Sequence, residues 1–218
     1  MKRFSFFSCC FFIFSLSVTS CSIEPDFEED KTENGAAKDG IKPTLNFLGD
    51  SIIDYWNNLD SYFEDYNCFN YGCSKKGIDT FLGKVDIAKI ADTECVIEIG
   101  TNDMMRVINA NNVDNYIEHY IEVLKSLKAK RIYLLSLLPR NRAKDKGFDY
   151  NSYYPIINDK IRILAKEKMN NIVYIPVYDL FLINGQVNWE YTYDGLHPNI
   201  NGYKVIADEI KKNLIKEV

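Results

Sequence analysis

Four short polar clusters contain the residue types that serine-based acyl transfer requires. Gly49-Asp50-Ser51 supplies a hydroxyl group, and Asp194-Gly195-Leu196-His197 places a carboxylate three residues before an imidazole. A serine becomes nucleophilic when a histidine accepts its proton, and a carboxylate holds that imidazole in the required tautomer. We therefore interpret Ser51 as a nucleophile, His197 as its general base and Asp194 as the orienting carboxylate.

The other two clusters offer donors for the oxygen that becomes negative during acyl transfer. Preorganised N–H groups stabilise such an oxyanion, and a glycine lets a backbone N–H come close to it. Gly72 follows Asn70-Tyr71, and Asn102 lies within Gly100-Thr101-Asn102-Asp103. We expect an oxyanion hole made of the backbone N–H groups of Ser51 and Gly72 and the side-chain amide of Asn102.

The elements that must position these clusters follow from the pattern of apolar residues. The predicted strands occupy residues 44–48, 95–99, 131–135 and 171–175, with a weaker candidate at 66–70. The predicted helices occupy residues 78–91, 113–130, 153–169 and 200–215. Such alternation favours a three-layer α/β/α domain over residues 41–218, with a five-stranded parallel sheet in flavodoxin-like order. Because ligands bind beyond the carboxyl ends of parallel strands, we expect all four clusters at one edge of that sheet.

Taken in order, the four clusters resemble the sequence blocks of the SGNH hydrolases, also called GDSL esterases and lipases, from about residue 45 to residue 207. The resemblance implies a serine esterase with Ser51, Asp194 and His197 in the catalytic roles and an acyl-enzyme intermediate. Two features depart from the family pattern. Ile52 replaces the usual leucine, and Gly77 comes late in its block, which implies a longer loop beside the oxyanion hole.

Each site residue also has a structural interpretation that the sequence leaves open. Ser51 and Asn102 are residue types that cap helices. Gly72 suits a turn, and Asp194 suits an Asx turn before a helix that begins near His197.

Several other reactive side chains receive structural interpretations. Asp50 and Asp103 are expected to accept hydrogen bonds that brace loops, and His119 is expected to be a structural residue of its helix. Cys68 and Cys73 are candidates for a disulfide in an oxidising compartment.

Aromatic residues near the expected site suggest the substrate class, because aromatic faces stack on sugar rings. We expect an acyl ester, with acetyl groups on a carbohydrate as the leading class; a lysophospholipase, a thioesterase and a non-catalytic glycan-binding protein are the alternatives. These rim candidates are Trp56, Tyr150, Tyr153, Tyr154, Trp189, Tyr191 and Tyr193. About half of them are expected to be core residues instead.

The first forty residues differ from the rest. A basic start and an apolar run at residues 4–18 are typical of a signal peptide, and Val18-Thr19-Ser20-Cys21 resembles a bacterial lipobox. We expect a signal peptide over residues 1–20, lipidation of Cys21 and anchoring in the outer membrane of the cell envelope; an uncleaved anchor or a plain signal peptide stays open. Residues 21–40 carry seven acidic and two basic residues and are interpreted as a tether.

Composition excludes other classes. The 218 residues are 46% hydrophobic and 26% charged, as in a single globular domain. The chain has 31 acidic and 26 basic residues, and this acidic excess argues against nucleic-acid binding. It has only two histidines, which argues against a metal site. We expect no cofactor, and nothing indicates an oligomeric state.

Overall fold

The computed structural model describes residues 42–215, so the predicted signal peptide, Cys21 and the acidic tether lie outside the described residues. Its main sheet has five parallel strands in the order β2-β1-β3-β4-β5, which confirms the predicted flavodoxin-like sheet. The strands are β1 (Thr44–Gly49), β2 (Asn67–Gly72), β3 (Glu94–Glu98), β4 (Arg131–Leu135) and β5 (Ile172–Ile175).

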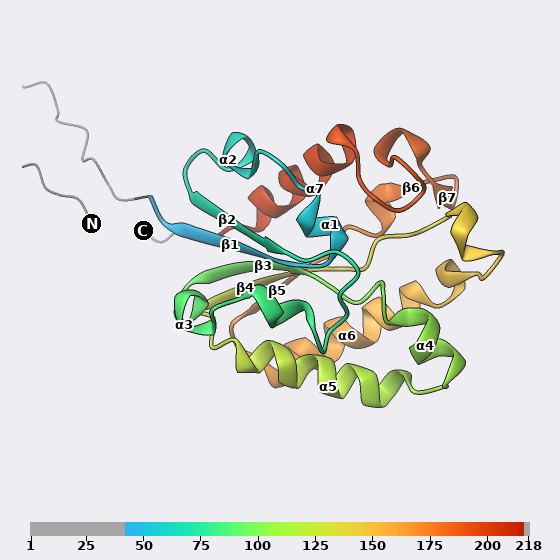
Figure 1. The fold of residues 1–218 in the computed structure, drawn as a ribbon, viewed down its shortest axis with the longest axis horizontal. Helices are drawn as coiled ribbons and strands as arrows, with labels where there is room; N and C mark the ends of the chain where they lie inside the picture. Colours follow the sequence, from blue (N-terminus) through green and yellow to red (C-terminus); the bar gives the residue numbers. More distant parts are fainter. Residues whose placement is uncertain (1–41, 216–218) are drawn as a thin grey trace, which may run out of the picture. The chain divides into compact units, whose positions relative to one another are not determined.

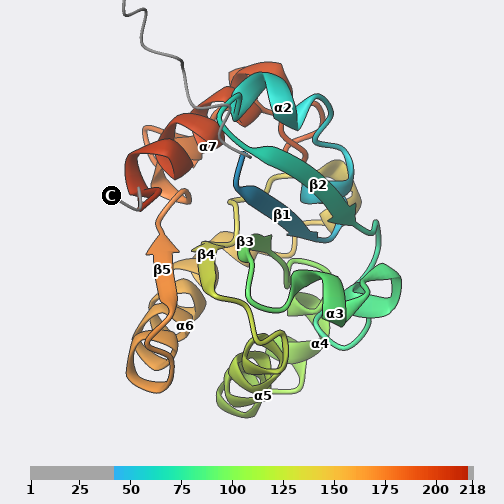
Figure 2. The same cartoon turned by 90° about the vertical axis from the view of Figure 1, so that its left-hand side faces the viewer.

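Helices cover both faces of this sheet and make the three predicted layers (Figures 1 and 2). One face carries α1 (Ser51–Asp54), α2 (Leu59–Tyr62) and α7 (Ile200–Asn213). The other carries α3 (Ile87–Ile90), α4 (Met104–Asn109), α5 (Val113–Ser126) and α6 (Tyr154–Lys168). Shorter elements in the connections are η1 (Phe81–Lys84), η2 (Ala143–Asp145), η3 (Tyr150–Ser152), η4 (Asp179–Phe181), β6 (Leu182–Ile183), β7 (Gln186–Val187) and η5 (Trp189–Tyr191). None of the helices between residues 42 and 215 is long and apolar enough to cross a membrane.

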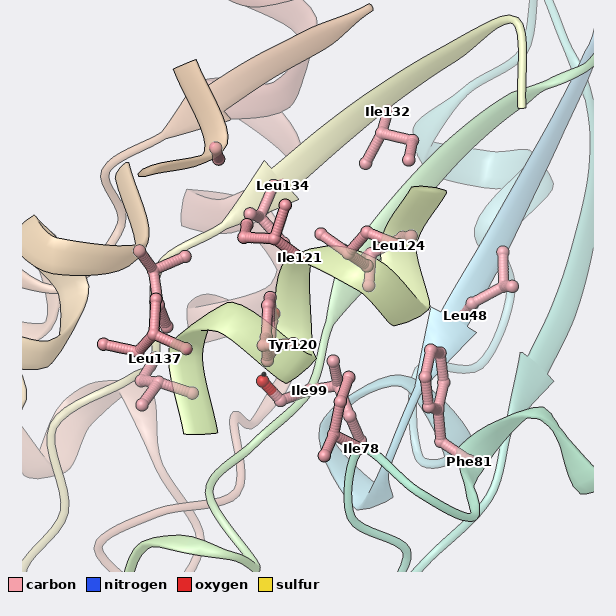
Figure 3. Packing of buried hydrophobic residues seen from close by; sticks show 14 of the residues in the cluster. Leu48, Ile78, Phe81, Ile99, Tyr120, Ile121, Leu124, Ile132, Leu134 and Leu137 are labelled. Atoms are coloured by element: carbon pink, nitrogen blue, oxygen red, sulfur yellow. Dashed lines mark hydrogen bonds between the residues drawn. The ribbon is translucent and has the colours of Figure 1, made fainter. Parts of the chain in front are cut away.

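Two apolar cores form because successive strand residues point to opposite faces of the sheet. In β4, Ile132 and Leu134 belong to the core under α5, whereas Tyr133 belongs to the core under α7. Figure 3 shows Ile121 and Leu124 of α5 over the strand residues on their side. Full burial of one such aliphatic side chain contributes about 1.5 to 3 kcal/mol, so these faces hold the layers in place.

The predicted helix over residues 78–91 is wrong, because the structure has two short elements there, η1 and α3. Gly83 lies within η1 and lowers helix propensity. The carboxylate of Asp86 accepts the Ala88 N–H at 3.1 Å and starts a new helix. The apolar pattern across both segments reflects one buried face, which two short elements share.

The disulfide considered between Cys68 and Cys73 is also wrong, since both thiols are free. Cys68 lies in β2, and Cys73 directly follows the strand. Five residues of extended chain span about 16 Å. A disulfide requires Cα atoms within about 7 Å of each other, so the strand keeps the two thiols apart.

The sheet register brings the expected site loops together. Gly49 at the end of β1 pairs with Gly72 of β2 and with Glu98 of β3, so these three strands end at the same level. The chain leaves β1 toward β2 on one side and continues to β3 on the other, which makes this edge the switch point of the sheet.

Candidate active site

Ser51 is the first residue of α1, which starts directly after β1. The cap of this helix is Asp50, whose carboxylate accepts the Ile52 N–H at 3.0 Å, so capping does not explain Ser51. As a first helical residue, Ser51 has a backbone N–H without an acceptor inside the helix. The hydroxyl and the backbone N–H of Ser51 therefore both lie at the carboxyl edge of the sheet.

The structure joins Ser51, His197 and Asp194 by hydrogen bonds, although 146 residues separate the serine from the histidine. Ser51 Oγ lies 3.0 Å from His197 Nε2. His197 Nδ1 lies 3.0 Å and 3.1 Å from the two carboxylate oxygens of Asp194. This is the arrangement in which a carboxylate fixes the tautomer of an imidazole that faces a hydroxyl.

Asp194 also forms the turn that the sequence left open. Its Oδ1 accepts the backbone N–H groups of Leu196 and His197 at 3.2 Å and 3.0 Å. Burial raises the pKa of Asp194, but the hydrogen bonds from His197 and the charges of His197 and Arg142 outweigh it and hold that pKa below its ordinary value. The carboxylate is therefore ionised at neutral pH.

The loop that carries Asp194 and His197 packs closely on the segment after β4. Gly195 has φ +81°, and a Cβ there would lie 2.1 Å from Asn141 O. The Asn141 N–H donates to Gly195 O at 2.7 Å. Glycine is needed here for both the backbone conformation and the close approach.

Helix α7, which follows this loop, is tied to α1. The Tyr203 hydroxyl donates to Ile52 O at 2.9 Å, and the ring of Tyr203 stacks on Trp56 with centroids 4.9 Å apart. The helix that begins at Ser51 and the helix that follows His197 thus hold each other in position.

Asn102 lies next to the serine loop, as predicted, but its side chain does not cap α4. Its Nδ2 donates to Asp50 Oδ2 at 3.1 Å and to Lys76 O at 2.9 Å. The Lys76 carbonyl belongs to the loop before Gly77, so the loop predicted to be long lies directly against this amide.

Gly72 does not present its N–H to Ser51 in this structure. That N–H donates to Asn70 Oδ1 at 2.8 Å. A Cβ at Gly72 would lie 2.1 Å from Asp54 N, so close packing of β2 against α1 explains the glycine. The oxyanion role of Gly72 stays a prediction, and it requires this N–H to turn from Asn70 to the substrate.

Three buried carboxyl groups surround the site loops: Asp50, Glu98 and Asp103. Asp103 accepts the Ile78 N–H at 2.9 Å and the Tyr116 hydroxyl at 3.0 Å, which confirms the loop-bracing interpretation. Burial, with a contribution from the nearby charge of Asp103, raises the pKa of Asp50 to about 7.

Glu98 is buried, and among the described residues neither carboxyl oxygen has a hydrogen-bond partner. Burial and the charge of Asp50 raise the pKa of Glu98 well above its ordinary value. An ionised carboxylate without a partner would be very costly at this position, so burial favours the protonated form of Glu98.

Sequence reasoning missed two side chains that contact the imidazole or its carboxylate. Arg142 Nη2 lies 2.8 Å from Asp194 Oδ2. The Tyr55 ring lies 5.1 Å from the His197 ring, measured between centroids. Tyr55 is one helical turn after Ser51, a spacing that would have identified it, whereas no sequence signal marks Arg142.

The aromatic residues expected at the rim divide into two groups. Trp56, Tyr150 and Tyr154 are core residues, which confirms the expectation that about half of the seven belong to the core. Tyr153, Trp189 and Tyr193 are exposed, Tyr193 to 73%, and Tyr191 is half-buried.

Other candidate features lie apart from Ser51. His119 is exposed and pairs with Asp79 at 2.6 Å, in agreement with its structural interpretation. A cavity of about 990 Å³ is lined by Thr44 and Glu94 at the amino ends of β1 and β3, the opposite edge of the sheet. No group of three or more metal-ligating side chains occurs within residues 42–215.

Comparisons with known proteins show a family and a fold for this chain. The sequence profile of the GDSL-like Lipase/Acylhydrolase family matches residues 47–205, from β1 into α7. A solved GDSL-like lipase from Bacteroides thetaiotaomicron VPI-5482 is 24% identical, with a TM-score of 0.63, over 79% of this chain and 87% of that chain. The acetylxylan esterase Axe2 from Geobacillus stearothermophilus is 18% identical, with a TM-score of 0.56, over 82% of this chain and 96% of that chain.

A second solved acetyl xylan esterase is 20% identical, with a TM-score of 0.63, over 79% of this chain and 100% of that chain. Among curated proteins, the N-acylneuraminate cytidylyltransferase of Escherichia coli O18:K1:H7 is 28% identical over 177 residues. The match covers 76% of this chain and 39% of that enzyme, so the chain spans about two fifths of its length.

Proposed function

The chain belongs to the GDSL-like lipase/acylhydrolase family and is a carboxylic ester hydrolase, and on that premise we propose that Ser51, His197 and Asp194 perform acyl transfer to water. The observation that supports these roles is the continuous set of hydrogen bonds from the Ser51 hydroxyl through the imidazole to the carboxylate. Both bonds have donor–acceptor distances of 3.0 Å, within reach for proton transfer.

The reaction proceeds through two similar steps. His197 Nε2 accepts the Ser51 proton while Oγ bonds to the ester carbonyl carbon. The tetrahedral intermediate collapses, its bond to the alcohol oxygen breaks, and the imidazolium gives its proton to the leaving alcohol. Water then attacks the acyl-enzyme with the same base, which releases the acid and restores Ser51.

The donors for the oxyanion are the Ser51 backbone N–H and the Asn102 amide. Because Asn102 donates to Asp50 and to the Lys76 carbonyl, the substrate oxygen has to replace one of these two acceptors. One oxyanion donor contributes about 2.7 to 4 kcal/mol. Gly72 joins only if its bond to Asn70 breaks, so we leave it out of the proposed hole.

We propose acetyl esters on a carbohydrate as the substrate class. The exposed rings of Tyr55 and Tyr193 support it: Tyr55 contacts His197, and Tyr193 directly precedes Asp194. Exposed Trp189 lies against the same loop, where its Cη2 is 3.0 Å from a Cβ built on Gly195. Two of the similar solved structures are acetyl xylan esterases, which adds support for this substrate class.

The first experiment compares the full chain with Ser51→Ala. The wild-type protein should hydrolyse p-nitrophenyl acetate and react with a fluorophosphonate probe, and Ser51→Ala should do neither while keeping its melting temperature within about 2 °C. Ser126→Ala, a change on the exposed face of α5, is the matched control. Hydrolysis by Ser51→Ala at the wild-type rate would refute the assignment, and an unlabelled wild type would favour a glycan-binding protein.

A second measurement addresses the substrate. Acetate release from acetylated xylan should exceed hydrolysis of long-chain p-nitrophenyl esters and thioesters. The reverse order would favour a lysophospholipase or a thioesterase of the same fold.

We also propose that the protein is a lipoprotein of the cell envelope. The lipobox-like sequence that ends at Cys21 and the acidic residues after it support this proposal.

A further inference from the structure

Arg142 lies beside the site, and neither the four sequence blocks nor the proposed reaction uses it. It contacts Asp194, the carboxylate that orients His197. We propose that Arg142 is a positioning residue that fixes the Asp194 carboxylate in the orientation His197 requires. This inference rests on the proposed esterase function.

The contact is a partly buried ion pair. Arg142 Nη2 lies 2.8 Å from Asp194 Oδ2, and the side chains are 16% and 36% exposed. The Nε of Arg142 is buried and has no acceptor among the described residues. A buried N–H without a partner is unfavourable, so general stability does not explain this placement, whereas the contact with Asp194 does.

The backbone of Arg142 is itself held firmly. Its N–H donates to Asp145 Oδ2 at 3.2 Å, at the start of η2. Asp145 is buried and forms an ion pair with Arg140, whose Nε lies 2.9 Å from Oδ2. The Arg140 guanidinium in turn lies 4.1 Å from the centre of the Tyr150 ring. The backbone N–H of Arg140 donates to Asn151 Oδ1 at 3.0 Å.

These contacts divide the carboxylate of Asp194 between two sets of donors. Oδ1 accepts two backbone N–H groups, Oδ2 accepts from Arg142, and both oxygens face His197 Nδ1. Without Arg142, Oδ2 would be free to turn toward water, and the imidazole would lose its fixed orientation. Small displacements of reacting groups cost up to about 100-fold in rate.

Arg142 also changes the charge near the imidazole. The groups that face His197 are Asp194 from its own loop and Ser51 and Tyr55 from α1. The guanidinium offsets part of the carboxylate charge, so its removal leaves more negative charge beside the imidazole.

The test measures p-nitrophenyl acetate hydrolysis by the full chain with Arg142→Gln and Arg142→Lys. For Arg142→Gln we expect kcat to fall about 10- to 100-fold with KM within about twofold, and the acid limb of the pH–rate profile to move to higher pH. Arg142→Lys should restore part of the rate. Arg162→Gln, which removes an exposed arginine paired with Asp159 on α6, is the matched control and should leave kcat unchanged.

A double substitution separates positioning from structure. Once Asp194→Asn has removed the carboxylate, Arg142→Gln should cause no further loss, because two residues that act through one contact are not additive. Wild-type kcat and pH profile in a folded Arg142→Gln variant would overturn the inference, as would an equal further loss in the Asp194→Asn background. An inactive wild-type enzyme would instead refute the proposed function and this role with it.

Discussion

Asp50 and Glu98 show how strongly single residues beside Ser51 respond to burial. Glu98 pairs in the sheet with Gly49, the residue before Asp50, and both carboxyl groups have raised pKa values because burial disfavours their charged forms. A carboxyl that binds its proton more tightly in the folded protein stabilises it fully at low pH. That stabilisation is lost as the pH rises through the folded-state pKa, which for Asp50 is a window from about pH 4 to about pH 7.

The change Glu98→Gln removes one of these two protons from the folding equilibrium. We expect the free energy of unfolding at pH 8 to rise, and its decrease between pH 5 and pH 8 to become shallower by up to about 1.4 kcal/mol per pH unit. Urea unfolding at several pH values measures this slope. The exposed Glu118→Gln on α5 is the control, and an unchanged slope in Glu98→Gln would show that Glu98 is ionised when folded.

At the scale of elements, the loop before α7 is held by close packing of the Gly195 backbone against the backbone of Asn141. Gly195 and Gly185 both have positive φ values, +81° and +75°. A Cβ at Gly195 would overlap Asn141 O, whereas a Cβ at Gly185, in the β6–β7 turn, would meet nothing within 4 Å. Alanine at Gly185 therefore tests only the positive φ value, whereas alanine at Gly195 tests the positive φ value together with the close approach to Asn141 O.

Gly185→Ala should lower stability by about 1 to 2 kcal/mol and leave kcat unchanged. Gly195→Ala should lower stability further and reduce kcat, because Asp194 and His197 must move with the loop. Thermal unfolding and ester hydrolysis on both variants check this. Equal effects of the two changes would contradict the importance of the Asn141 contact.

Most elements could be predicted from the sequence because each has a local signal. The core strands β1, β3, β4 and β5 are short apolar runs, and α5, α6 and α7 have one apolar face over three or more turns. Helices α1, α2 and α4 have only four to six residues, too few for a periodic signal, so the sequence did not indicate them.

At the scale of the whole molecule, the two edges of the sheet have different surroundings. The described chain enters β1 at Thr44, at the amino edge, and the strand runs toward Ser51 at the other edge (Figure 1). Ser51 therefore lies at the edge of the sheet opposite to the one where β1 begins.

Lipid anchoring through Cys21 is tested on the full chain. Cys21→Ser should abolish palmitate incorporation. It should also remove the protein from the membrane fraction and place it in the aqueous phase when the sample is partitioned with detergent. Its kcat for p-nitrophenyl acetate should stay within about twofold of wild type, because the described site contains no residue before β1. Continued labelling of the Cys21→Ser variant, with membrane retention, would refute lipidation at this residue.

The sequence by itself determined the order of the four clusters, the positions of the core strands and the candidate roles of Ser51, Asn102, Asp194 and His197. These properties are local: residue type, apolar period and position after a strand can be read along the chain. Only the tertiary structure decided that the Gly72 N–H donates to Asn70, that burial raises the pKa of Glu98 and that Arg142 contacts Asp194. Those outcomes depend on burial and on contacts between distant segments, which form only when the sheet brings its loops together.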